Sequence, residues 1–221
     1  MNHTIQRRVL LRIASLVAAV TCVAAIRAPG QEPAPTPTEQ VPALDQQVPL
    51  IKDAYKDYFC IGTAGDLPGR YSAEELALVK EHFNFVTPEN CMKPGPIHPS
   101  EDCWRFERSD PLVAFCVEYG IAIHGHTLVW HAQTNNWFFE DGDKEVITRR
   151  MKDHIGTLVG RYKGKIQSWD VVNEAINDRG NAQTSQTENL RNSAWLRAMG
   201  PDFLTLAFKF AHEADPDAKL Y

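Results

Sequence analysis

The chain has 221 residues, of which 43% are hydrophobic and 23% are charged, and its formal net charge at pH 7 is −5. This composition is typical of a globular protein and excludes a chain that is disordered throughout. Four of the 23 basic residues lie in the first 27 positions, so the rest of the chain carries 19 basic against 28 acidic residues. This balance argues against a nucleic-acid partner, and no run of 18 apolar residues follows to suggest a membrane span.

The first 27 residues have the pattern of an export signal. Three arginines form a basic start, an apolar run over residues 16–26 follows, and small residues offer a cleavage site. We therefore expect residues 1–27 to be a signal peptide and the protein to be secreted or periplasmic. A membrane anchor is the alternative, but the run is short and lacks a stop-transfer pattern, so no stable anchor is expected. Lipidation of Cys22 is a second alternative, although the residues before it match such a signal poorly.

A proline-rich segment follows the predicted signal. Residues 28–42 hold five prolines in fifteen positions. Proline at this density cannot build a helix or a central strand. We expect residues 28–43 to form an extended linker, with a single folded domain over residues 44–221.

Four cysteines remain after the predicted signal. Cys60 lies in an apolar run and Cys116 on the apolar face of a predicted helix, so both are expected to be buried thiols. Cys91 and Cys103 lie in one loop region, and an exported protein could join them by a disulfide. The cysteine spacings match no zinc motif, and no metal is expected.

From residue 44 onward, helix and strand patterns alternate. The helices are indicated by apolar residues at helical spacing, by a capping box from Ser72 to Glu75, and by Asp110 as the expected cap of the third helix. In chain order we expect a helix over 44–57, a strand over 59–62, a helix over 72–83, a strand over 85–87, a helix over 111–119, a strand over 121–127, a helix over 144–162, a strand over 166–172, a helix over 194–214 and a strand from 219.

The connections between these strands are too long for hairpins, so the strands are expected to pair in parallel. The chain then holds four βα units and the first residues of a fifth. A parallel sheet of this α/β class is either open and doubly wound or closed into a barrel. No GxGxxG motif opens a helix after the first strand, which disfavours a dinucleotide-binding fold.

Polar residues gather where three of the predicted strands end. The segments are TPENCMK at 87–93, HGHTLVWHAQ at 124–133 and WDVVNEA at 169–175. In a parallel barrel this edge carries the active site, and polar side chains buried there without a ligand would be unfavourable. Ten side chains would surround one opening: Glu89, Asn90, Lys93, His126, Trp130, His131, Gln133, Asp170, Asn173 and Glu174. Carboxylates and amides hydrogen-bond hydroxyl groups and an indole stacks on a sugar ring, so this set favours a carbohydrate ligand.

The three segments, in this order and at this spacing, resemble those of glycoside hydrolase family 10, the retaining endo-β-1,4-xylanases. The resemblance covers residues 44–221 and implies a (β/α)8 TIM barrel, here truncated to about four and a half βα units. It implies an endo-1,4-β-xylanase that needs no cofactor, with xylan and xylo-oligosaccharides as its partners. Two residues depart from the family's usual pattern: Asn135 stands where a proline is common, and His124 where an arginine is common.

The resemblance also implies a role for each matching residue. Glu174 matches the general acid/base, and Asn173 matches a residue that contacts the sugar 2-hydroxyl beside the cleaved bond. Asp170 and His131 match supporting residues, with Asp170 placed to hold His126. The remaining substrate-binding matches are His126, Trp130 and Gln133 around that sugar, and Glu89, Asn90 and Lys93 at the next subsites.

The chemistry of glycoside hydrolysis supports the same role for Glu174. The leaving oxygen must be protonated by a carboxylic acid of raised pKa, and in a retaining enzyme a second carboxylate lies about 5–5.5 Å away as the nucleophile. The resemblance places that nucleophile after a seventh strand, whereas the 221 residues reach only the fifth. We therefore expect an N-terminal fragment of a xylanase that is inactive by itself.

Two other classes of function remain open. A half-barrel could bind oligosaccharides without any catalysis. Alternatively, His124 and His126, with His131 as a third imidazole, could be the metal ligands of a barrel amidohydrolase. In those enzymes such a pair lies on the first strand, however, and no further set of ligands follows in this sequence.

Overall fold

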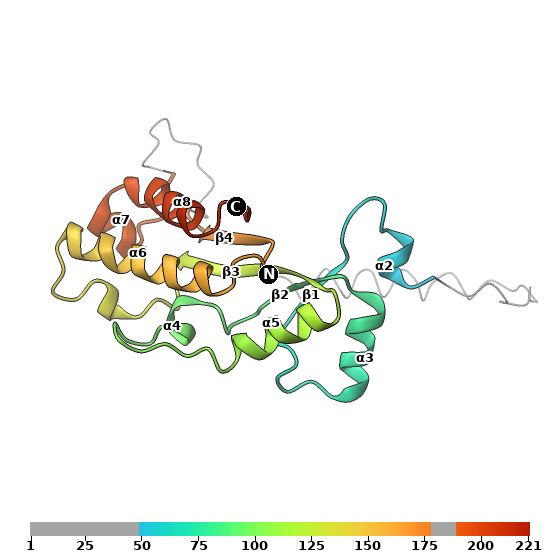
Figure 1. Ribbon diagram of the computed structural model, residues 1–221. Coiled ribbons are helices and arrows are strands. Elements are labelled where there is room, and N and C mark those ends of the chain that lie inside the picture. The colour runs from blue at the N-terminus through green and yellow to red at the C-terminus, as the bar shows by residue number, and fades with distance from the viewer. Residues whose placement is uncertain (1–48, 178–188) are drawn as a thin grey trace, which may run out of the picture. The chain divides into compact units, whose positions relative to one another are not determined.

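The computed structural model describes residues 49–177 and 189–221 (Figure 1). The predicted signal peptide (1–27), the predicted linker (28–43) and the beginning of the helix predicted over 44–57 lie outside these residues. Within the two described ranges, no helix combines the length and the apolar character that a bilayer span requires.

Five strands form one sheet in the order of the sequence, and every neighbouring pair is parallel. The strands are β1 (Gly62–Ala64), β2 (Phe85–Thr87), β3 (Ala122–Trp130), β4 (Ser168–Asn173) and β5 (Lys219–Leu220). The parallel sheet of alternating βα units predicted from the sequence is confirmed. Strands that follow one another both in the chain and in the sheet are the arrangement of a β/α barrel wall.

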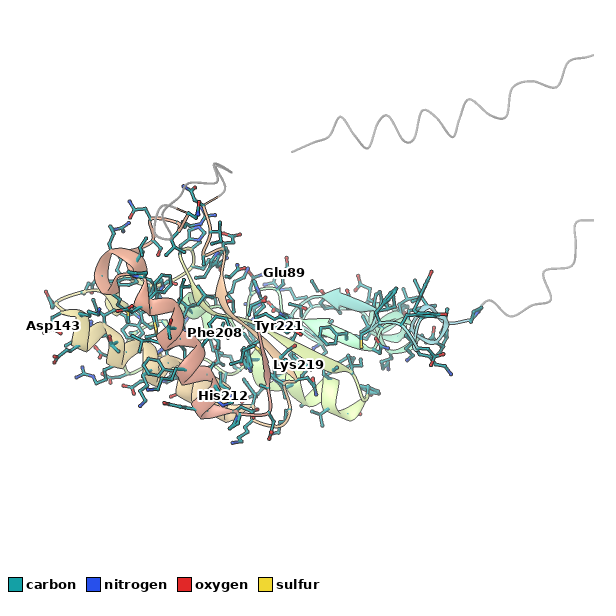
Figure 2. All side chains as sticks on the ribbon, turned by 90° about the horizontal axis from the view of Figure 1, so that it is seen from above. Glu89, Asp143, Phe208, His212, Lys219 and Tyr221 are labelled. Carbon is teal, nitrogen blue, oxygen red and sulfur yellow. The ribbon has the colours of Figure 1, made fainter. Side chains whose placement is uncertain are left out.

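Helices connect the strands and cover the sheet. They are α2 (Ile51–Ala54), α3 (Ala73–His82), α4 (Pro94–Ile97), α5 (Ser109–Glu118), the 3-10 turn η1 (Asn136–Phe138), α6 (Lys144–Arg161), α7 (Ala194–Met199) and α8 (Asp202–Ala214). Figure 1 shows α6 and α8 side by side next to β3 and β4. In Figure 2, α8 runs from Phe208 to His212 against the direction in which β5 runs from Lys219 towards Tyr221.

Side-chain caps set the beginnings of three of these helices; at α7, the Ser193 hydroxyl accepts the Leu196 N–H at 3.1 Å. The Ser72 hydroxyl accepts the backbone N–H of Glu75 at 3.2 Å, and the Glu75 carboxylate accepts the backbone N–H of Ser72 at 2.7 Å, which confirms the predicted capping box. Asp143 caps α6 by accepting the Val146 N–H at 3.0 Å. Each cap satisfies backbone donors that the first helical turn leaves unpaired.

The prediction that Asp110 caps α5 is wrong. The helix begins at Ser109, so Asp110 lies inside its first turn. Its carboxylate accepts hydrogen bonds from the Arg161 guanidinium, at 2.8 Å from Nε, and from the Tyr162 hydroxyl at 2.9 Å. These two donors come from the far end of α6, and they use the carboxylate oxygens that a cap would have needed.

Two predictions near the beginning of the described residues are also wrong. Of the predicted helix 44–57, the structure describes residues 49–57, and within these only the four residues of α2 are helical and turns follow them. The strand predicted over 59–62 begins later, because only residues 62–64 lie opposite β2. Cys60 therefore lies before the sheet and is exposed instead of buried.

The single helix predicted over 194–214 is two helices. Gly200 has a φ of 74° after the end of α7, and Pro201, which has no N–H to donate, precedes α8. Cys116 is a buried thiol as predicted, and Cys91 and Cys103, for which a disulfide was left open, are both free.

The core lies between the sheet and the helices that cover it. Its largest side chains with less than 2% exposure include Trp169, Leu128, Ile123, Met151, Ile155 and Leu158. Gly125 on β3 lies directly opposite Trp169 on β4. A β-carbon on Gly125 would come within 2.2 Å of the indole ring, so this glycine leaves the space that the ring fills.

We predict that Gly125→Ala lowers the free energy of unfolding by about 1–3 kcal/mol, because the buried indole of Trp169 has no room to move away. Gly156→Ala is the matched control. A β-carbon there meets nothing within 4 Å on α6, so alanine should raise the free energy of unfolding by up to about 1 kcal/mol. Urea denaturation of both variants checks this, and equal stability of the two variants would contradict the packing described.

Candidate active site

The three polar segments singled out in the sequence reach the carboxyl ends of neighbouring strands, and much of the second and third lies within β3 and β4 themselves. Residues 88–93 follow β2, residues 131–135 follow β3, and Glu174 follows β4. In Figure 2, Glu89 lies on the side of the molecule towards which β5 runs from Lys219 to Tyr221. Since all the strands are parallel, these segments meet at one edge of the sheet.

The pairing of β3 with β4 brings the central side chains together. His126 lies opposite Asp170, and Trp130 lies opposite Asn173. The register shifts between His126 and Val129, so β3 carries extra chain where the two strands approach the site. Such an irregularity bends a strand locally and changes the direction of the side chains that follow it.

Glu174 is held in an unusual backbone conformation at the end of β4. Its φ is 53°, a region that non-glycine residues seldom occupy outside constrained sites. The indole Nε1–H of Trp130 donates to its Oε2 at 3.0 Å, and Nδ1 of His131 lies 3.5 Å from the same oxygen. Arg191 donates to the Glu174 backbone carbonyl at 2.9 Å. The carboxyl group is thus oriented on one side and remains accessible, with 46% of the side chain exposed.

Asp170 lies between two histidines of β3. His126 Nδ1 is 2.8 Å from one carboxylate oxygen, and His124 Nε2 is 3.0 Å from the other. Partial burial raises the pKa of Asp170, but the hydrogen bonds from His124 and His126 outweigh that effect and hold the pKa well below its usual value. Asp170 is therefore ionised at neutral pH and orients both imidazole rings. His124 also bonds the Ser168 hydroxyl at 2.7 Å.

Lys93 joins the segment after β2 to the end of β3. Its Nζ donates to the side-chain oxygen of Asn90 at 3.2 Å and lies 5.1 Å from the ring centre of Trp130. A cation over the face of an indole is attracted by the ring. This attraction uses none of the N–H donors of the ammonium, so they remain available to other acceptors. Asn90, Lys93, Trp130 and Glu174 thus form one connected row of contacts.

Gln133 takes part through its backbone. It has a φ of 47°, and its carbonyl accepts the N–H of Gly95 at 2.5 Å. Asn135, which departs from the usual family pattern, donates from its amide to the carbonyls of Gly95 and Pro99, both at 3.1 Å. Asn135 therefore ties the segment after β3 to the segment around α4.

Asp66, directly after β1, is the residue of this edge that sequence reasoning missed. One of its oxygens accepts the backbone N–H groups of Glu89, Asn90 and Cys91, and the other is 2.7 Å from Arg108. In the sequence, Asp66 is indicated only as a polar residue that comes shortly after a strand end containing glycine. The partners of Asp66 lie 23 to 42 residues further along the chain, and no local pattern indicates them.

The metal hypothesis finds no support in this geometry. His124 and His126, its proposed ligands, both bond Asp170. Within 49–177 and 189–221, no three His, Cys, Asp or Glu side chains are placed to hold an ion together.

The fold and the position of these side chains define an α/β protein of the barrel type, with a polar site at the carboxyl ends of its strands. A family model for glycosyl hydrolase family 10 matches residues 50–221. The chain therefore belongs to glycosyl hydrolase family 10, and its five strands are part of a (β/α)8 barrel.

The relatives of this chain are longer than the chain itself. Endo-1,4-beta-xylanase A of Thermotoga maritima is 45% identical in an alignment of 188 positions that covers 80% of this chain and 17% of that protein. A family 10 endoxylanase retrieved from a sugarcane soil metagenome is 47% identical, with a TM-score of 0.70 over 77% of this chain and 49% of that one. An intracellular xylanase from Thermoanaerobacterium saccharolyticum, solved in complex with xylotriose, is 35% identical, with a TM-score of 0.70 over 79% and 56%. The chain thus spans about half the length of these solved structures.

We predict that Asp170→Asn lowers the free energy of unfolding by roughly 1–3 kcal/mol at pH 5, because it removes a carboxylate with two hydrogen-bonded partners. The folded pKa of Asp170 lies below its unfolded value, so this contribution is complete above the unfolded pKa and is lost as the pH falls towards the folded one. Urea denaturation at pH 5, 4 and 3 should show the gap between wild type and variant narrowing. A gap that stays constant or widens would contradict an ionised Asp170.

Proposed function

We propose that the protein is an endo-1,4-β-xylanase that cleaves xylan with retention of configuration, and that Glu174 is its general acid/base. The observation that carries this proposal is the Glu174 carboxyl group, which lies at the carboxyl end of β4, bonded by the Trp130 indole and open to solvent. Family membership and relatives named as xylanases support it.

The proposed chemistry begins with protonation of the glycosidic oxygen. Glu174 would donate this proton from its carboxyl group and later remove one from the attacking water, as retaining hydrolysis requires. Trp130 and His131 both lie near Oε2 of Glu174, and the second oxygen, which has no partner among residues 49–177 and 189–221, would face the substrate. The family resemblance implies that the nucleophile, a second glutamate, follows the seventh strand of the barrel.

The proposed sugar contacts lie in the row that ends at Glu174. Asn173 and His126 flank the position of the sugar beside the cleaved bond, and Trp130 offers its indole there. Further along, Lys93, Asn90 and Glu89 offer an ammonium, an amide and a carboxylate to the hydroxyl groups of the next sugars. Gln133 completes the proposed set, and the xylotriose bound by the Thermoanaerobacterium relative supports a linear xylo-oligosaccharide as the ligand.

The test uses a hybrid in which this chain is followed by the C-terminal half of the sugarcane-soil endoxylanase, since the two match over about half of the latter. We predict that the hybrid hydrolyses xylan and that Glu174→Gln reduces this rate roughly 10²–10⁴-fold. Aryl xylosides with good leaving groups need little protonation, so their cleavage should fall much less.

Glu213→Gln is the matched control, because among the described residues Glu213 of α8 pairs only with the exposed Lys152 of α6 and Lys209 of α8; it should leave both rates unchanged. An equal loss on xylan and on activated aryl xylosides would argue against Glu174 as the acid. A folded hybrid that binds xylo-oligosaccharides but cleaves neither substrate would favour the non-catalytic binding protein instead.

A further inference from the structure

We propose that Asp66 is a positioning residue for substrate binding, whose carboxylate holds the backbone of residues 89–91 in the conformation that presents Glu89 and Asn90 to a sugar. The inference rests on the proposed function only in taking these two side chains as sugar contacts. The geometry of the backbone contacts stands independently of it.

Three consecutive backbone N–H groups converge on one oxygen of Asp66. The distances from Oδ1 are 3.1 Å to the nitrogen of Glu89, 3.0 Å to that of Asn90 and 3.0 Å to that of Cys91. Successive amides that point at one anion form a concave site, which an isolated loop would not retain without its anion. The segment after β2 therefore takes its shape from a residue after β1.

The second oxygen of Asp66 keeps the carboxylate in this orientation. Nη2 of Arg108, which directly precedes α5, lies 2.7 Å from Oδ2. The Arg108 side chain is 60% exposed, whereas that of Asp66 is only 11% exposed. An exposed arginine contributes little Coulombic stability, so its effect here is to orient the carboxylate. Asp66 thus connects the segments after β1, after β2 and before α5.

The Asp66 carboxylate that accepts the N–H groups of the loop is ionised at neutral pH. Partial burial raises the pKa of Asp66, but the backbone N–H groups of Asn90 and Cys91, the Cys91 thiol and Arg108 outweigh this and lower the pKa overall. Any other loop conformation would leave a largely buried carboxylate without its donors, which is strongly unfavourable. The loop and the carboxylate therefore stabilise each other in this one arrangement.

A cavity beside the loop shows why such a restraint is needed. Its volume is about 530 Å³, and its lining includes Asp66, Glu89, Asn90 and Arg108. The side chains of Glu89 and Asn90 thus border open space on this side instead of packed core. Without Asp66, the loop has room to relax into the cavity, and Asn90 would leave the oxygen-to-ammonium contact that it makes with Lys93.

The experiment compares Asp66→Ala and Asp66→Asn with wild type in the full 221-residue chain, with Asp143→Ala as the control. Asp143 also accepts a backbone N–H, at the beginning of α6, and Figure 2 shows it far from Glu89. Two quantities are measured: NMR hydrogen exchange of the amides of residues 89–91 without ligand, and the dissociation constant for xylotriose by calorimetry.

We expect Asp66→Ala to accelerate exchange of these three amides and to weaken xylotriose binding by roughly tenfold or more. Asp66→Asn keeps one acceptor oxygen but loses the charge, so both effects should be smaller. Asp143→Ala should lower the stability of the chain but leave both the exchange rates of residues 89–91 and the dissociation constant for xylotriose unchanged. If alanine prevents folding, the asparagine variant decides the question.

Wild-type exchange rates at residues 89–91 in a folded Asp66 variant would overturn the positioning role. Faster exchange with unchanged affinity would show that the restraint does not serve binding, and this also contradicts the inference. If the wild-type chain does not bind xylotriose, the proposed sugar site is contradicted instead. The hydrogen-exchange measurement distinguishes this outcome from a failure of the positioning role of Asp66, because it needs no ligand.

Discussion

The parallel pairing of β3 with β4 is the constraint on which the candidate site depends. Because Gly125 leaves room for the Trp169 indole, the two strands approach closely, and His126 then lies opposite Asp170. The shift in register between His126 and Val129 places Trp130 opposite Asn173, one residue before Glu174. The contact between Trp130 and Glu174 follows from this pairing and from the positive φ of Glu174.

Three carboxylates organise this edge of the sheet in different ways. Asp170 is bonded by two imidazoles of β3, and Asp66 is surrounded by backbone N–H groups and a guanidinium. Both have lowered pKa values and are ionised at neutral pH. Glu174 has one indole donor and a neighbouring imidazole, and with 46% of its side chain exposed it is the most accessible of the three, against 31% for Asp170 and 11% for Asp66. Two carboxylates thus hold the site in place, and the third is accessible to a substrate.

Local patterns were sufficient to predict most of the fold. Residue spacing and short motifs predict the parallel order of the strands, the long helix α6 and the capping box at Ser72. The structure confirms all three. The helix predicted over 194–214 is divided at Gly200 and Pro201, a break that apolar spacing by itself does not indicate. The prediction of the first strand over 59–62 is wrong because the pairing with β2, which the local sequence does not show, determines that residues 62–64 form β1.

The site was less accessible to sequence reasoning than the fold. The ten polar residues are predictable from the sequence because they lie in three compact segments, within β3 and β4 or just after β2, β3 and β4. Asp66 was not found, because its three amide partners meet it only after β1 and β2 pair. The prediction that Asp110 caps α5 is wrong for a similar reason, since its donors come from the distant end of α6. Interactions that join residues far apart in the chain leave no local signature.

The central proposal is that Glu89 and the row of contacts from Asn90 to Glu174 form one sugar-binding site. The most direct test is a titration of the ¹⁵N-labelled chain with xylotriose, followed by the NMR signals of the Trp130 indole N–H and of the amides of Glu89, Asn90 and Glu174. The account predicts that these four signals shift together with one dissociation constant, while amides on α6 and α8 stay unchanged. Shifts confined to other parts of the chain, with these four signals unmoved in the presence of bound xylotriose, would contradict it.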